Sequence, residues 1–297
     1  DIDTYHMAAC AIDTAVRNAV SAGVNLDKLA LLDNFCWCSS DDPERLGQLK
    51  EAARACYDYA VAYSAPYISG KDSMFNDFSG YDEEGCAVKI SVPPTLLVSS
   101  FGVTDDFRKA PSMDSKFAGD LVYVIGETKD ELGGSEYFTY LGESRDAASE
   151  AGGEAFIGNN VPQVDADVNM RTYRAVEKAI EGGLLASCES VSIGGLGVSL
   201  ARVAIAGELG MDLSIGSPDL RGDFALFSES QGRFVVTVDP KKKDAFEAVM
   251  SDANVIFGQI GTVRKDGKFL IQSGGRVIVD TDVKALNSAY RELFKNY

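Results

Sequence analysis

The sequence predicts an α+β protein in two parts, an α/β N-terminal domain over residues 1–113 and an α+β C-terminal domain over residues 114–297. Two long amphipathic helical patterns and a pair of alternating strands come first, an order typical of helices packed on one face of a mixed sheet. The apolar pattern then weakens near residues 111–117, and a new apolar strand begins at Asp120. We place the domain boundary at that change.

The first part begins with a helical pattern over residues 6–22, in which apolar residues form one wide face. A short buried strand over residues 29–32 follows, with Asp33 at its C-terminal end. Asp42-Pro43 combines a capping residue with a proline at the first helical position, and it begins a second amphipathic helix.

A short extended segment over residues 66–68 leads directly into the polar sequence Gly70-Lys71-Asp72-Ser73, which we interpret as a loop. A turn-rich tip lies between Gly80 and Glu84. Strand patterns then follow at residues 87–92 and 95–103, joined at Pro93-Pro94.

The second part mixes strands, helices and glycine turns. Its glycine-rich segment from Gly142 to Asn160 predicts a mobile loop. Strand patterns occupy residues 120–125, 233–238, 253–263 and 276–279, and helical patterns occupy residues 168–182, 198–206, 241–251 and 282–295.

The composition excludes several classes of function. The formal net charge is −17, so no positive field is available to bind nucleic acid or an anionic membrane surface. No apolar run is long enough to span a bilayer. Six scattered cysteines without a secreted-framework spacing indicate reduced thiols and a cytoplasmic protein. The helical pattern starts almost at residue 1, which suggests a piece of something longer.

The sequence Gly70-Lys71-Asp72-Ser73 places a glycine, a cation, an acid and a hydroxyl in four residues. Glycine lets backbone N–H groups approach a phosphate, and lysine supplies a point charge. The spacing is not that of a Walker A loop. A polar turn without a ligand is the alternative interpretation.

Weaker candidates lie elsewhere in the chain. Asp33, at the end of a strand, is either a ligand contact or the cap of a turn. Gly194-Gly195 before a helix resembles an anion-binding helix N-terminus, although it also suits an ordinary turn. His6 is the only histidine, and we expect it to be structural. No catalytic triad or metal cluster can be built, and Cys36-x-Cys38 lacks a second pair of ligands.

Eight segments, in order along nearly the whole chain, resemble the second half of the small-type phosphoribosylformylglycinamidine synthase family. They are Tyr5–Ala9, Ala30–Trp37, Ile68–Ser73, Val92–Leu97, Asp130–Tyr137, Asn160–Asp165, Gly194–Val198 and Leu226–Phe234.

The resemblance implies an aminoimidazole-ribonucleotide-synthetase-like unit, in which the N-terminal domain is half of a barrel. It implies a part in a purine-biosynthesis ligase that uses ATP, Mg²⁺ and an ammonia donor to make formylglycinamidine ribonucleotide. That chemistry depends on positioned phosphates and metal ions. The family's catalytic histidine and most of its metal ligands lie in the other half, so this chain is expected to contribute no catalytic residue and to be inactive alone.

Family positions that contact ATP fall here on Asp33, Gly70 and Lys71, and a substrate-binding position falls on Ser73. Some family members have a metal-binding asparagine where this chain has Lys71. A protonated lysine cannot bind Mg²⁺, so Lys71 is expected to offset phosphate charge instead.

The family also has a second, auxiliary nucleotide site, which in this chain is degenerate. Asn18, Ser192, Gly194 and Gly195 are retained. The family's metal-binding carboxylates are replaced by Thr14, Ser190 and Ile193. Because Mg²⁺ prefers a carboxylate among its ligands, we expect weak or no binding of Mg-nucleotide.

The resemblance implies several partners: the N-terminal half of the same enzyme, a glutaminase subunit and a small bridging subunit. The isolated chain is expected to form a homodimer through the sheet edge and apolar helix face that would meet the other half. The alternative is a non-catalytic pairing or scaffold module of the same fold. Other enzymes of the superfamily need an N-terminal acidic, glycine-rich phosphate loop that is absent here.

Overall fold

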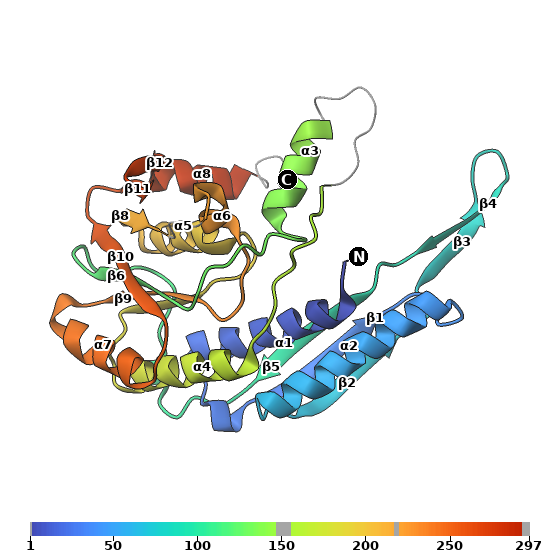
Figure 1. Ribbon diagram of the computed structural model, residues 1–297, viewed down its shortest axis with the longest axis horizontal. Coiled ribbons are helices and arrows are strands. Elements are labelled where there is room, and N and C mark those ends of the chain that lie inside the picture. The colour runs from blue at the N-terminus through green and yellow to red at the C-terminus, as the bar shows by residue number, and fades with distance from the viewer. Residues whose placement is uncertain (1, 147–155, 217–219, 293–297) are drawn as a thin grey trace.

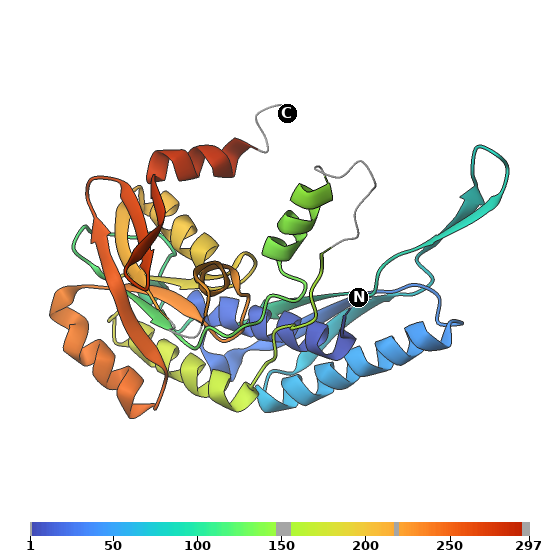
Figure 2. The same ribbon diagram turned by 45° about the horizontal axis from the view of Figure 1, so that its top comes forward.

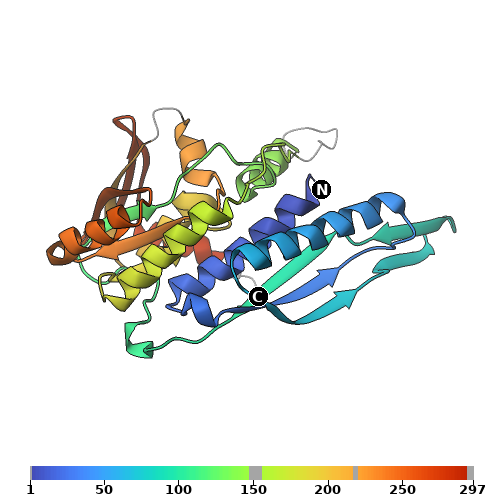
Figure 3. The same ribbon diagram turned by 60° about the horizontal axis from the view of Figure 1, so that its bottom comes forward.

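The computed structural model describes residues 2–146, 156–216 and 220–292. Its first part is a three-stranded sheet with helices on one face (Figures 1 and 3). The strands, in spatial order, are β2 (Tyr67–Ser73), β1 (Ala30–Cys36) and β5 (Thr95–Phe101), and the helices are α1 (Thr4–Ser21) and α2 (Pro43–Ala62). β1 runs parallel to β2 and antiparallel to β5.

Both helices start where capping residues occur in the sequence. The Asp3 side chain accepts from the backbone N of His6 at 2.8 Å, and Asp42 accepts from the backbone N of Glu44 at 2.9 Å. Each such cap contributes about 1 kcal/mol by satisfying a backbone N–H that the helix leaves free. The predicted helices are confirmed within a few residues at each end.

Two strand predictions were wrong in the same region. The segment from Gly70 to Ser73 is not a loop, because it forms most of strand β2 and pairs with residues 33–36 of β1. Asp33 is the fourth residue of β1 and not its end. The predicted turn-rich tip is confirmed as the end of a two-stranded hairpin, β3 (Asp77–Tyr81) and β4 (Ala87–Ser91), which projects away from the body (Figures 1 and 2).

The second part is built on a mixed seven-stranded sheet. Its strands, in spatial order, are β12 (Arg276–Asp282), β11 (Lys268–Ser273), β8 (Gly210–Ile215), β10 (Phe257–Arg264), β6 (Leu121–Ile125), β9 (Phe234–Val238) and β7 (Ser187–Ser190).

Helices cover both faces of this sheet (Figure 2). On one face lie α4 (Ala166–Glu181) and α7 (Lys243–Asp252), and on the other lie α5 (Gly195–Gly207), α6 (Gly222–Phe227) and α8 (Val283–Glu292). Strand β9 is buried on both sides, since Phe234 and Val236 pack with the first layer and Val235 with the second.

The two parts share one hydrophobic core. Helix α1 packs against α2 and β5 in the first part and against α4 and β7 in the second. The core cluster accordingly runs from Val16 and Trp37 to Val176 and Phe246. Short helices η1 (Leu26–Lys28), η2 (Phe107–Lys109) and η3 (Pro240–Lys242) occupy the connections.

The segment from Gly142 to Asn160, predicted to be a mobile loop, begins inside helix α3 (Glu136–Asp146), and residues 147–155 lie outside the described residues. The placement of a domain boundary near residue 113 stays a prediction. In the described part of the chain, no helix combines the length and apolar character that a membrane crossing requires.

Candidate functional site

The four predicted pocket residues lie on two faces of the three-stranded sheet. Asp33 pairs with Gly70, and a Cβ atom added to Gly70 would lie 2.3 Å from Oδ1 of Asp33, so both positions point to the same face. The electrostatic effect of Asp33 on the Cys56 thiol of α2 identifies this as the helix-covered face. Burial raises the pKa of Asp33, and the nearby Asp72 carboxylate raises it further.

Lys71 and Ser73 lie on the opposite, open face, because side chains alternate along a strand. The Nζ atom of Lys71 donates to Oγ of Ser73 at 3.3 Å. Lys71 is exposed and has no carboxylate partner among the described residues, so its charge is available to a ligand. The structure therefore brings Lys71 together with Ser73 and separates both from Asp33.

The open face is unusually apolar for a solvent-facing surface. Leu97 is 59% exposed and Phe101 is 62% exposed on the edge strand β5. Phe78 and Ile90, on the projecting hairpin, are similarly exposed. In Figure 3, α1 and α2 lie on the other side of these strands. Apolar surface of this kind commonly marks an interaction site.

A cavity of about 740 Å³ lies between α1, β5 and the second part of the chain, and it includes residues of the predicted auxiliary site. Asn18 and Ser192 both line it, and Gly194 lies next to them at the start of α5. Gly195 has φ of +67°, and a Cβ atom there would lie 2.5 Å from the backbone oxygen of Ser228. The structure thus places two of the four retained residues, Asn18 and Ser192, on one cavity. Their role in binding stays a prediction.

Glu229 is a residue of this cavity that sequence reasoning missed. Its Oε1 atom accepts from the backbone N of Gly194 at 2.9 Å and from the backbone N of Glu136 at 3.1 Å. One carboxylate therefore occupies the N-termini of α5 and α3. Burial raises its pKa, while these two hydrogen bonds act in the opposite direction. The sequence indicated this residue only indirectly, because Glu229 lies in the segment Leu226–Phe234 that resembles the synthase family.

A buried polar network joins the two parts behind this cavity. Asp13 and Arg17 are fully buried and form an ion pair within α1. Oδ1 of Asp13 also accepts from the Tyr173 hydroxyl at 2.6 Å and from Nδ2 of Asn169 at 2.9 Å. In the sequence, this pair is indicated by an acid and an arginine four residues apart on an otherwise apolar helix face, because charges that are buried are usually paired.

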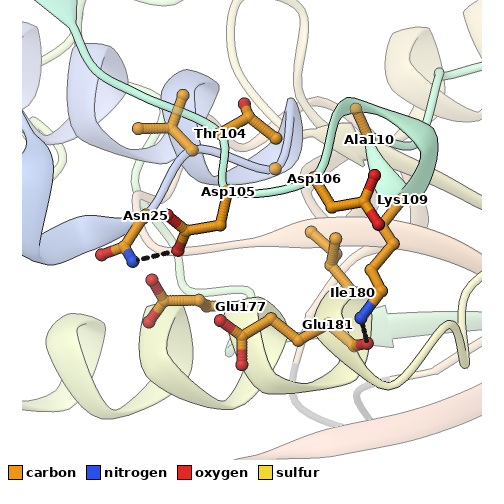
Figure 4. A pocket seen from close by; sticks show the side chains of 11 residues that line it. Asn25, Thr104, Asp105, Asp106, Lys109, Ala110, Glu177, Ile180 and Glu181 are labelled. Carbon is orange, nitrogen blue, oxygen red and sulfur yellow. Dashed lines mark hydrogen bonds between the residues drawn. The ribbon is translucent and has the colours of Figure 1, made fainter.

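A smaller acidic pocket of about 180 Å³ lies near the C-terminal ends of α1 and α4 (Figure 4). Asn25 donates to Asp105, and Nζ of Lys109 donates to the backbone oxygen of Glu181 at 2.8 Å. The carboxylate of Glu177 accepts from the backbone N of Leu26 at 2.8 Å. These contacts fasten the loops of the first part to α4, which gives the pocket a structural role.

The described residues contain no group of three His, Cys, Asp or Glu side chains placed to hold a metal ion. All six cysteines are free thiols.

A family profile for the AIR synthase related protein, C-terminal domain, matches residues 118–273, more than half of the chain. The chain belongs to this family. The mixed α+β architecture with helices on both sides of the large sheet is the AIR synthase-like fold.

Curated relatives extend the match to almost the whole chain. The phosphoribosylformylglycinamidine synthase subunit PurL of Methanocaldococcus jannaschii is 30% identical over an alignment of 298 positions, which covers 99% of this chain and 37% of the relative. The PurL subunit of Alkaliphilus metalliredigens is 31% identical over 290 residues, 98% of this chain and 36% of that protein. The AIR synthase-related chain thus spans little more than a third of these relatives' length.

Solved structures share the fold at low sequence identity. Thermotoga maritima PurL complexed with FGAR matches with a TM-score of 0.69 and 14% identity, over 96% of this chain and 43% of that one. The hydrogenase maturation protein HypE in complex with ATP matches with a TM-score of 0.59 and 15% identity, over 93% of this chain and 79% of its own.

Proposed function

We propose that this chain is the C-terminal part of a phosphoribosylformylglycinamidine synthase and forms one wall of its ATP and substrate site. The observation that carries the proposal is the match to PurL subunits at about 30% identity across 99% of this chain. The reaction would join an ammonia-derived nitrogen to formylglycinamide ribonucleotide at the expense of ATP, in the purine pathway. The Thermotoga maritima relative has been solved with FGAR, ATP and ADP.

A common ligand for Lys71 and Ser73 is part of this proposal. Both lie on the open face of the sheet, and a phosphate group placed there would meet an exposed ammonium group and a hydroxyl donor. Lys71 would offset the charge of the ATP phosphates, and Ser73 would bind the substrate. Asp33 and Gly70 stay proposed ATP contacts, and they would have to reach the nucleotide from the side that faces α2.

The catalytic side of this site would come from the N-terminal half of the same enzyme. The exposed Leu97 and Phe101 and the projecting hairpin support a partner that covers the open face. In the isolated chain a second copy would take that place. A glutaminase subunit and a small bridging subunit are further proposed partners, and the cytoplasm is the proposed location.

Mg²⁺ would accompany ATP in the complete enzyme, but the part of this chain that the structure describes offers it no suitable set of ligands. The described residues contain no cluster of three potential ligands, and Thr14, Ser190 and Ile193 stand where the auxiliary site would need carboxylates. A single hydroxyl is a weak substitute for an anionic oxygen. We therefore derive no step through a metal held by this part.

The decisive experiment compares the protein encoded by the complete reading frame with this chain alone. ADP release that depends on both formylglycinamide ribonucleotide and ammonium is expected from the complete protein only. In that protein Lys71→Met should lower kcat/KM for ATP about tenfold or more, because a charge-assisted contact is lost. Lys50→Met, which removes an exposed lysine from α2, should leave it unchanged.

Absence of that turnover in the complete protein would overturn the proposal. If the chain still paired with its upstream half under those conditions, it would instead be a non-catalytic pairing module of the same fold. Equal effects of Lys71→Met and Lys50→Met would remove the role of Lys71 and leave the enzyme assignment standing.

A further inference from the structure

The cavity beside α1 has the size of a small-molecule site but an unusual lining. Its volume is about 740 Å³, within the range that holds a drug-sized ligand. Met7, Ile157, Val161 and Pro162 give it apolar walls. Among the described residues that line it, the charged side chains are the carboxylates of Asp3 and Glu229, with no lysine or arginine.

The position most suited to an anion is already taken by the protein itself. A helix N-terminus attracts negative charge through its free N–H groups and its dipole. Here Oε1 of Glu229 accepts from Gly194 and Glu136 at 2.9 and 3.1 Å, at the starts of two helices. Its Oε2 atom has no hydrogen-bond donor among the described residues. A phosphate entering the cavity would therefore meet a like charge where it would otherwise be bound.

A second carboxylate, that of Glu131, is close to the cavity but does not line it. Glu131 is 7% exposed, and its Oε1 atom accepts from the backbone N of Gln163 at 3.2 Å. Its Oε2 atom is buried without a partner among the described residues. Burial raises the pKa of the Cys10 thiol, which lines the cavity, and the carboxylates of Asp13, Glu131 and Glu229 raise it further, while Arg17 lowers it. Their negative potential therefore reaches the cavity.

The buried arginines do not cancel this charge. Arg17 is paired with Asp13. Arg233 is fully buried but donates to the backbone oxygens of Ser230 and Ser228, at 2.9 and 2.6 Å, and not to a carboxylate. Glu131 and Glu229 are thus two carboxylates near one arginine, Arg233, and Asp3 is a further carboxylate in the cavity lining. Buried carboxylates in excess are stabilised by a cation.

We propose that this cavity binds an organic cation, with an ammonium or amidinium group at Oε2 of Glu229 and an apolar body against Met7 and Val161. Leu97 of the open sheet face also lines this cavity, but Lys71 and Ser73 do not, so the proposal does not depend on the function proposed above. It also assigns the cavity a ligand of opposite charge to a nucleotide.

Three probes that share one ring but differ in charge test the proposal: benzamidine, benzamide and benzoate. Methyl-labelled methionine gives the readout, because Met7 lines the cavity whereas Met250 is fully buried in the core and serves as an internal reference. Met7→Leu assigns the resonance. Benzamidine should shift the Met7 signal saturably and at least tenfold more tightly than benzamide, and benzoate should not shift it.

The matched variants separate charge from helix capping. Glu229→Gln keeps an oxygen that can accept from Gly194 and Glu136, so the fold should persist while the affinity for benzamidine falls at least tenfold. Glu136→Gln removes an exposed carboxylate nearby and should change the affinity less than twofold. Equal affinities for the three probes, no Met7 shift with any of them, or unchanged binding in Glu229→Gln would each overturn the proposal. So would micromolar, magnesium-dependent binding of ADP at Met7, measured by calorimetry and the same resonance.

Discussion

The Asp13 carboxylate is the group whose loss we expect to destabilise this protein most. It is fully buried and holds Arg17 of α1, the Tyr63 hydroxyl at the end of α2, and Tyr173 and Asn169 of α4. Burial alone lowers the pKa of Arg17, but Asp13, with the tyrosines, outweighs it and raises that pKa above its ordinary value. By contrast, the pKa of Arg233 is lowered to about 9, mainly by burial and next by the nearby positive charge of Arg17.

The substitution Asp13→Asn keeps the shape and a hydrogen-bond acceptor but leaves Arg17 as an unpaired buried charge. Breaking a buried ion pair in this way costs about 3–5 kcal/mol. For a chain of this size that corresponds to a fall in Tm of roughly 6 °C or more. Urea unfolding at pH 7, followed by far-UV circular dichroism, measures the free energy of unfolding directly.

Two variants sharpen the test. Asp106→Asn removes a partly exposed carboxylate whose partner Arg108 lies on the surface, and it should lower the free energy of unfolding far less than Asp13→Asn does. Adding Arg17→Met to Asp13→Asn removes the unpaired charge and should recover most of the loss. A cost below about 1 kcal/mol for Asp13→Asn, or no recovery in the double variant, would refute the argument that charge pairing stabilises this site.

Three further predictions follow from other positions. Gly70→Ala places a methyl group 2.3 Å from Oδ1 of Asp33 and should cost about 1–3 kcal/mol in urea unfolding, whereas no loss would mean that Asp33 turns away freely. Burial raises the pKa of Asp120, so its native state keeps a proton that the unfolded chain releases, and stability should fall as pH rises above about 4. Asp120→Asn should flatten that fall in Tm between pH 4 and 7, and an unchanged slope would contradict it. The isolated chain should dimerise in sedimentation, Phe101→Glu should weaken this, and a monomer at high micromolar concentration would argue against pairing through the open face.

The helices could be predicted from the sequence because their signals are local. Asp3 and Asp42 mark the starts of α1 and α2, and the apolar residues of α1 recur on the face that is buried. Strand β7, Ser-Cys-Glu-Ser over Ser187–Ser190, has no such signal, since its burial depends on pairing with β9 and on helices distant in sequence. Glu229 likewise could not be identified from the sequence, because its contacts with Gly194 and Glu136 join residues that are distant along the chain.

Strand β2 was predicted as a loop for a reason that also supports a missing partner. Alternation identifies a strand when one face meets a core and the other meets water. In this sheet the helix-covered side carries the buried Leu31, Phe35 and Leu96, but on β2 it carries Gly70 and Asp72, so β2 itself shows no apolar alternation. The uncovered side carries the exposed Leu97 and Phe101, so apolar residues lie on both sides of the sheet. A second unit that covered the open face would bury these two side chains and enclose Lys71 and Ser73 between the two units, where a water-excluded charge acts most strongly on a phosphate.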